Sequence, residues 1–135
     1  MTTYNSKSNE LHLLRYSLAA IWLITAVVSF WDAEQANSLG RQWLLQNGLE
    51  NKDWQSGLIV AGIAWDALLG LLLVFAKQKS WVYGLALAGT IVMTLLATWL
   101  TPQIWLHPMG PLFKNLVIWA ALWVLLKASR KLALE

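Results

Sequence analysis

The chain has 135 residues, of which 58% are hydrophobic and only 13% are charged, and its formal net charge is +3. A soluble domain is about 45–50% apolar and about 25% charged, so a water-soluble core of this size could not hide so much apolar surface. The composition instead fits a protein in a lipid membrane, because a helical bundle there is apolar outside as well as inside. The chain contains no Cys, which excludes disulfides, thiolate nucleophiles and Cys-ligated metals.

The first apolar run covers residues 11–31, and its one charged residue is Arg15. The run is longer than the apolar core of a signal peptide and has no clear small-residue cleavage site, so we interpret it as an uncleaved helix. In the polar stretch that follows, Asp32 and Gln35 resemble a capping box, and apolar residues recur at helical spacing. This pattern predicts a short amphipathic helix over about 33–47, at the membrane interface. A solvated loop is the alternative.

Three further apolar runs cover residues 56–76, 81–100 and 108–127. Each has about 20 residues, enough to cross roughly 30 Å of hydrocarbon. The sequence therefore predicts one all-α transmembrane domain over 1–135, an integral membrane four-helix bundle with the interfacial helix in its first extracytoplasmic loop. Trp is typical of membrane interfaces, and several Trp fall at the expected outer helix ends; these are Trp31, Trp54, Trp99 and Trp105.

The cations are distributed unequally between the two sides of the predicted bundle. They gather in the N-terminal flank, in the turn between the second and third helices and in the C-terminal tail; these are Lys7, Arg15, Lys77, Lys79, Lys127, Arg130 and Lys131. The positive-inside rule then places both termini in the cytoplasm, as expected for a multi-pass protein of the inner (plasma) membrane. An even number of crossings requires this agreement. The pattern gives no reason to expect a nucleic-acid partner.

Asp66 is the one charged residue of the second helix. An ionisable group at the membrane centre costs at least about 2.5–3.5 kcal/mol on insertion scales and is a candidate functional residue. Gly62 and Gly70 lie four residues to each side, so the three share a helix face, and small residues favour close helix contact. We expect Asp66 to point into the bundle, next to Trp65.

Lys114 lies about six residues into the fourth helix, and its long side chain could reach towards Asp66, with Asn115 adding an amide. Three interpretations remain open: a structural ion pair, a polar site that binds a ligand headgroup or relays a proton, and a protonated Asp66 bonded to a carbonyl. For a ligand site, Trp65 and Trp119 would wall the cavity.

His107 lies at the outer end of the fourth helix. It could exchange a proton with a ligand, although a lone interfacial His is more often solvated. The sequence contains no metal-ligand spacing, phosphate-binding Gly-rich loop or nucleophile elbow.

The segment PQIWLHPMGPLFKNL, residues 102–116, resembles the P…W…P-x-G…K-N signature of the DoxX-like family. The AIWL segment from Ala20 and the acidic residue of the second helix match the same pattern. The resemblance implies a four-helix membrane protein and gives the motif residues as Pro108, Gly110, Lys114 and Asn115, with Asp66 as their acidic partner. Some relatives are membrane subunits associated with quinone-linked oxidoreductases or are linked to nucleotide-binding reductase domains.

Two functions are compatible with these features. The first is a membrane subunit of a quinone-linked redox system, which binds a lipid-like ligand such as quinone between its helices and has no catalysis of its own. Its partners would be the lipid bilayer and a soluble or membrane oxidoreductase. The alternative is a non-enzymatic assembly factor, scaffold or small carrier, in which the Gly84 and Ala88 face of the third helix contacts a partner or another copy in a homo-oligomer. A cavity that reaches Asp66 favours the first, and a dry bundle with Asp66 paired to Lys114 favours the second.

Overall fold

The computed structural model describes residues 2–76, 79–100, 102, 106 and 113–134. The described residues form five helices and no strand. The helices are α1 (Thr2–Glu34), α2 (Leu39–Gln46), α3 (Lys52–Phe75), α4 (Ser80–Leu100) and α5 (Phe113–Leu134).

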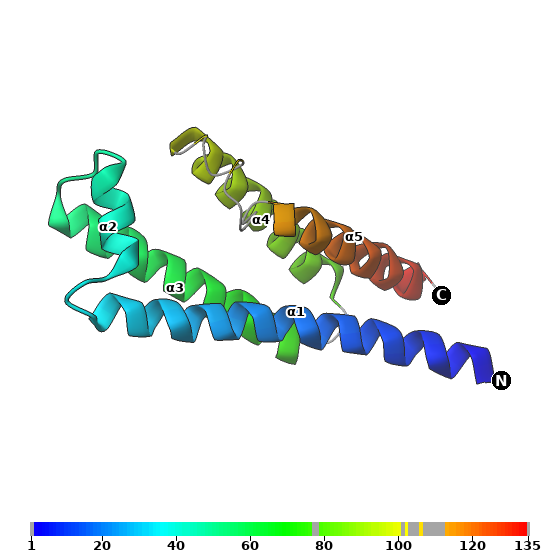
Figure 1. Cartoon of the computed structure of the whole chain (residues 1–135). Coiled ribbons are helices and arrows are strands. Elements are labelled where there is room, and N and C mark those ends of the chain that lie inside the picture. The colour runs from blue at the N-terminus through cyan, green and yellow to red at the C-terminus, as the bar shows by residue number, and fades with distance from the viewer. Residues whose placement is uncertain (1, 77–78, 101, 103–105, 107–112, 135) are drawn as a thin grey trace.

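The four long helices alternate in direction, so that the N- and C-terminal ends lie at the same end of the molecule (Figure 1). The short helix α2 lies at the opposite end. Most of the packing is between α1 and α3 and between α4 and α5. These two pairs meet over smaller contacts, α1 with α5 and α3 with α4. The molecule is therefore two helix pairs joined side by side rather than four equally packed helices.

Three segments are long and apolar enough to cross a membrane: Ser8–Glu34, Lys52–Phe75 and Ser80–Leu100. The structure confirms the predicted all-α fold and three of its four spans. Helix α5 is not among the spans found in the described residues, and it carries Lys114 near its start and basic residues in its last turns. The beginning of the predicted fourth span, at 108–112, lies outside the described residues.

The outer surface of the long helices is apolar. Large side chains on it are more than half exposed; examples are Val27, Phe30, Val60, Phe75 and Leu95. Exposing such side chains to water costs about 25 cal/mol for each Å², so this surface is suited to lipid. Three Trp are exposed at helix ends on the α2 side, where the sequence places the outer interface; these are Trp31, Trp54 and Trp99.

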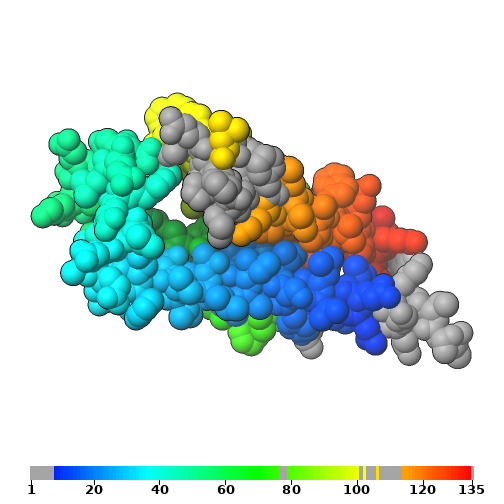
Figure 2. Space-filling view, viewed as in Figure 1, coloured from blue at the N-terminus to red at the C-terminus, as the bar shows by residue number. Residues whose placement is uncertain are grey.

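The buried core lies in the half of the bundle that is nearer the termini. All four long helices contribute to it, with Leu18 and Trp22 from α1, Leu69 and Leu73 from α3, Val82, Tyr83 and Ala86 from α4, and Leu122, Leu125 and Leu126 from α5. Towards α2 the packing is looser, and the space-filling view is hollowed beside α2, with α3 at the bottom of the hollow (Figure 2).

Two glycines allow close approach between helices. A Cβ at Gly70 would lie 2.6 Å from Leu23 Cγ and 3.2 Å from the Leu23 backbone nitrogen, so α1 lies directly against α3 here. A Cβ at Gly89 of α4 would collide with the Trp65 ring of α3. Gly62 has nothing within 4 Å of its Cβ position. Of the predicted Gly62–Asp66–Gly70 face, only the Gly70 end is in close helix contact.

Helix α2 is shorter than the predicted 33–47, because α1 continues to Glu34 and residues 35–38 form the turn. The predicted capping box of Asp32 with Gln35 is wrong. Ser38 is the N-cap residue of α2, and its hydroxyl accepts the Arg41 N–H. Asp32 instead holds this turn from the end of α1: its carboxylate accepts hydrogen bonds from the Ser38 hydroxyl at 2.8 Å and from the backbone N–H groups of Leu39 and Gly40 at 2.9 and 3.1 Å.

We expect Gly70→Ala to destabilise the protein by about 1–3 kcal/mol, the usual cost of overpacking a closely packed contact. The added methyl group would have to displace Leu23 and separate α1 from α3. Thermal unfolding in detergent measures the effect. Gly62→Ala is the matched control, since its Cβ enters open space. Equal melting temperatures for the two variants would contradict the close α1–α3 contact.

We expect Asp32→Ala to release α2 from the end of α1, because it removes the acceptor of three hydrogen bonds. Backbone amides of residues 39–46 should then exchange hydrogen faster, while α3 keeps its protection. Glu34→Ala is the control, since it removes a neighbouring exposed carboxylate. If both variants exchange alike, the Asp32 bonds do not hold α2.

Candidate functional site

A cavity of about 220 Å³ lies next to the core, where the four long helices meet. We call it the central cavity. Its lining residues are Ile21, Trp22 and Thr25 of α1, Trp65 and Asp66 of α3, Gly89, Thr90 and Met93 of α4, and Asn115 and Ile118 of α5. Most of the wall is apolar, with a few polar groups that converge on the same space. This combination is typical of a small-molecule site.

Asp66 is half-buried in the wall of the central cavity. One turn further along α3, Gly70 brings that helix against α1, which turns the Asp66 face inwards. Among the residues that the structure describes, none donates a hydrogen bond to the Asp66 carboxylate. Within the described residues, its carboxylate thus lines the cavity without an internal donor.

The remaining polar groups of the cavity come from amide and hydroxyl side chains. The Asn115 Nδ2 donates to Thr94 Oγ1 at 2.8 Å and joins α5 to α4. Thr90 donates its hydroxyl proton to the Ala86 carbonyl at 2.7 Å, and Thr25 donates to the Ile21 carbonyl at 2.7 Å. A hydroxyl that donates can still accept, so Thr25 and Thr90 offer oxygen acceptors beside Asp66.

Lys114 does not join this site. Its side chain is exposed, and it is not a lining residue of the central cavity. The described residues contain no ion pair between Lys114 and Asp66, so the structure does not form the pair that the sequence suggested. The reason is helical geometry: neighbouring residues point about 100° apart, and Asn115, which faces the cavity, turns Lys114 away.

A pair between Asp66 and Lys114 would require the second and fourth predicted helices to pack on each other, and this is not the main packing either. Helix α3 packs mainly on α1, and α5 packs mainly on α4. The two helices instead meet at a shared space, since Asp66 of α3 and Asn115 of α5 both line the central cavity.

The other predicted site residues divide between the cavity and its surroundings. Trp65 lines the cavity, with its ring against Gly89. Trp119 is half-buried on α5, outside the lining, and its Nε1 is buried without a hydrogen-bond partner in the described part of the chain. His107 lies outside the described residues. The cavity thus brings together Asp66, Asn115 and Trp65 from the predicted set.

Several lining residues were not predicted, among them Thr25, Thr90 and Met93. One signal for them was present in the sequence. Thr90, Thr94 and Thr98 recur at a spacing of four, which places three hydroxyls on one face of an otherwise apolar helix. Such a polar stripe within a membrane span indicates an inward-facing surface.

An apolar outer surface, three helices able to cross a membrane and a partly polar cavity between the helices define a small helical membrane protein. The family model of the DoxX-like family matches residues 19–123. The match covers most of the chain, and the chain belongs to the DoxX-like family. This confirms the resemblance seen around Lys114 and Asn115. Comparisons with curated proteins and with solved structures gave no match.

We expect the hydrogen bond between Asn115 and Thr94 to couple α5 to α4 measurably. In a double-mutant cycle with Thr94→Val and Asn115→Leu, the coupling free energy should be about 0.6 kcal/mol, an average value for interhelical bonds in membrane proteins. Of the two single changes, Thr94→Val should cost more stability, because it leaves the Asn115 amide without its acceptor. Unfolding in detergent measures all four variants. Strictly additive effects would contradict the bond.

Proposed function

We propose that this protein is the membrane subunit of a quinone-linked redox system and binds the quinone ring in its central cavity. The observation that carries the proposal is the position of Asp66, whose carboxyl group faces a cavity and accepts no hydrogen bond from the described residues. A polar group placed in this way inside a membrane bundle is costly unless a ligand or water engages it.

The size of the cavity suits one ring. An apolar cavity of about 150 Å³ can hold benzene, and pockets for drug-sized ligands begin at about 300 Å³. The central cavity, at about 220 Å³, lies between these limits. It would hold a substituted ring, while an isoprenoid tail would have to leave between the helices and lie against the apolar outer surface.

The polar groups also match both redox states of a quinone. A carboxylate accepts a hydrogen bond from a hydroquinone hydroxyl, and a protonated carboxyl donates to a quinone carbonyl. The Thr25 and Thr90 oxygens add acceptors on two other walls. Oxidation of bound hydroquinone to quinone releases two protons and two electrons. We propose that Asp66 takes the first proton, that the second passes to water, and that both electrons pass to an oxidoreductase partner.

The alternative function, an assembly factor, scaffold or small carrier, predicts a dry bundle with Asp66 paired to Lys114. The cavity at Asp66 and the exposed position of Lys114 give this alternative less support. One feature remains in its favour. The Gly84 Cβ position has nothing within 4 Å and Ala88 is exposed, so this face of α4 is not used within the chain.

We further propose the topology of a multi-pass plasma-membrane protein with both termini in the cytoplasm. Two observations support it. The termini lie at one end of the molecule (Figure 1), and that end carries the cations Lys127, Arg130 and Lys131, as the positive-inside rule requires.

Replacing Asp66 should change the affinity for short-chain ubiquinol and ubiquinone differently. Asp66→Leu removes a hydrogen bond to a charged acceptor, worth about 1.5–3 kcal/mol, so ubiquinol binding should weaken about tenfold or more. Asp66→Asn should also weaken the binding of ubiquinol. It should leave the affinity for ubiquinone unchanged, because its amide can still donate to a quinone carbonyl. Anaerobic equilibrium binding to the purified protein measures both ligands.

Asp53→Asn is the matched control, because it neutralises an exposed carboxylate on the same helix, away from the cavity. It should leave both affinities unchanged. If unaltered protein binds neither ubiquinol nor ubiquinone, or if Asp66→Leu binds both as the unaltered protein does, the proposed ligand is wrong.

A further inference from the structure

A buried positive charge without a counter-charge lies at the end of the molecule that holds the termini. Arg15 is only 3% exposed. Its Nη2 donates to the Tyr16 hydroxyl at 2.9 Å, and its Cζ lies 4.7 Å from the centroid of the Tyr16 ring. Its Nε and Nη1 are buried without a hydrogen-bond partner in the described part of the chain. A guanidinium stays protonated in proteins, so these donors belong to a charge that needs an anion.

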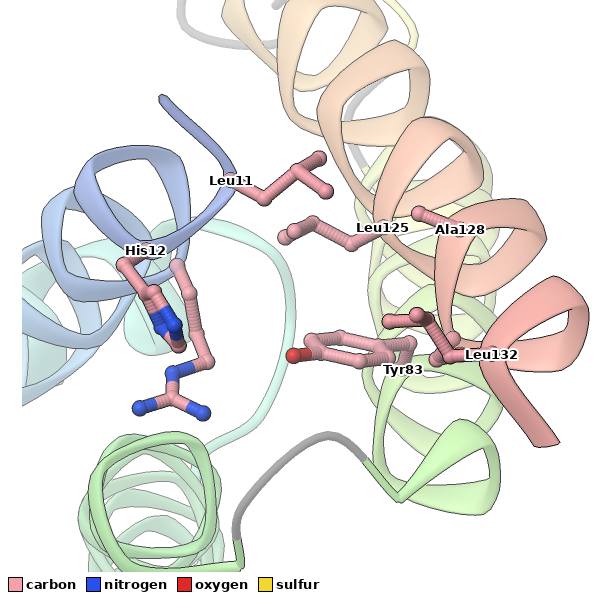
Figure 3. Close-up of a pocket in the computed structure, with 8 residues that line it drawn as sticks. Leu11, His12, Tyr83, Leu125, Ala128 and Leu132 are labelled. Carbon is pink, nitrogen blue, oxygen red and sulfur yellow. The ribbon is translucent and has the colours of Figure 1, made fainter. Parts of the chain in front are cut away.

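The groups around Arg15 do not supply that anion. Arg15 lines a small cavity between α1, α4 and α5, which we call the Arg15 cavity, with His12, Tyr83 and Ser129 as its other polar lining residues (Figure 3). The hydroxyl of Tyr83 points from α4 towards α1 and interacts with the Arg15 guanidinium, but it brings no negative charge. Tyrosine and serine hydroxyls are neutral, and Ser129 donates its proton to the Leu126 carbonyl at 2.9 Å. Within the described ranges, no Asp or Glu forms an ion pair with Arg15.

The shape of the Arg15 cavity restricts what can enter. Its volume is about 10 Å³, room for about one water-sized group, so a single oxygen atom can reach the guanidinium while the rest of the ligand stays outside. The other walls are apolar and include Leu11, Leu125 and Leu132 (Figure 3). A ligand that touches both surfaces must join an anionic oxygen to an apolar body.

The position of Arg15 along α1 fits the headgroup boundary of a membrane. The span Ser8–Glu34 has 27 residues, about 40 Å at 1.5 Å for each residue, which exceeds the roughly 30 Å of hydrocarbon. The excess length leaves room for the first turns of this span to extend beyond the hydrocarbon on the side of the termini. Arg15 follows these turns, where lipid phosphates are within reach of a basic side chain.

We infer that Arg15 binds the phosphate of an anionic membrane phospholipid, with one phosphate oxygen in the Arg15 cavity and the acyl chains against the apolar residues beside it. A charge-assisted hydrogen bond from one of the two unpartnered nitrogens to that oxygen would place an anion beside the buried guanidinium. The cavity shares no lining residue with the central cavity, so this inference is independent of the proposed quinone function.

The test compares lipid headgroups on the full-length protein in nanodiscs. We expect native mass spectrometry to show retained phosphatidylglycerol in preference to phosphatidylcholine by about tenfold, because the choline cation of phosphatidylcholine offsets the charge of its phosphate and leaves no net negative charge for Arg15. Arg15→Gln should abolish the preference. Arg130→Gln should keep the preference. Arg130 is an exposed cation of α5 at the same end of the molecule as Arg15, and it only adds to the general attraction of anionic lipids to the surface.

Thermal unfolding gives a second readout, in which the effect of Arg15→Gln on the melting temperature should depend on the lipid. In phosphatidylglycerol, Arg15→Gln should lower the melting temperature relative to unaltered protein. In a maltoside detergent, which carries no phosphate, it should leave the melting temperature unchanged or raise it, since an uncompensated buried charge is removed. An arm with millimolar inorganic phosphate in the maltoside detergent separates the two sources of phosphate. Stabilisation by free phosphate equal to that by phosphatidylglycerol would overturn a lipid site.

Two other outcomes would also overturn the inference. One is equal loss of the phosphatidylglycerol preference in Arg15→Gln and Arg130→Gln, which would mean attraction to the surface as a whole. The other is the absence of any preference in the unaltered protein, a result that does not depend on whether Arg15→Gln folds.

Discussion

Polar groups between these helices have lipid rather than water as their alternative surroundings, and this constraint explains most of the structure. Many of these groups are satisfied by the described residues: the hydroxyls of Thr25, Thr90 and Thr94 donate to carbonyls of their own helices, and the Asn115 amide donates to Thr94. Besides Trp119 Nε1, which lines neither cavity, two exceptions are informative. The Asp66 carboxyl and the Arg15 guanidinium each face a separate cavity, where a partner from outside the chain can reach them.

The two cavities lie on opposite sides of the same packed layer. Leu69 and Leu122, both fully buried, separate the central cavity from the end that holds the termini. The two helix pairs meet over smaller contacts than those within each pair. The close α1–α3 contact at Gly70 and the Trp65 ring against Gly89 fix the layer, and space remains on either side of it.

Hydropathy and charge predicted the all-α class and most of the long helices. A membrane requires each span to have a minimum length and an apolar composition, and one or two polar residues do not obscure such a run. Asp66 was also predictable, since one carboxylate in an apolar run has few roles. The pairing with Lys114 was not. Depth along the membrane suggested that the two could meet, but the direction of each side chain depends on helix rotation, and the interior position of Asn115 decides it. Arg15 was expected among the cations of the N-terminal flank, and its burial involves α4 and α5, which are distant in sequence.

The ladder of threonines on α4 has a mechanical consequence. Thr90, Thr94 and Thr98 each donate to the carbonyl four residues earlier, so three successive turns carry a carbonyl shared between a backbone N–H and a hydroxyl. Sharing of this kind weakens the helix slightly and often bends it. Helix α5 packs along α4, and its Asn115 donates a hydrogen bond to Thr94 in the middle of this threonine series. Contact with α5 therefore limits how far α4, which forms one wall of the central cavity, can bend.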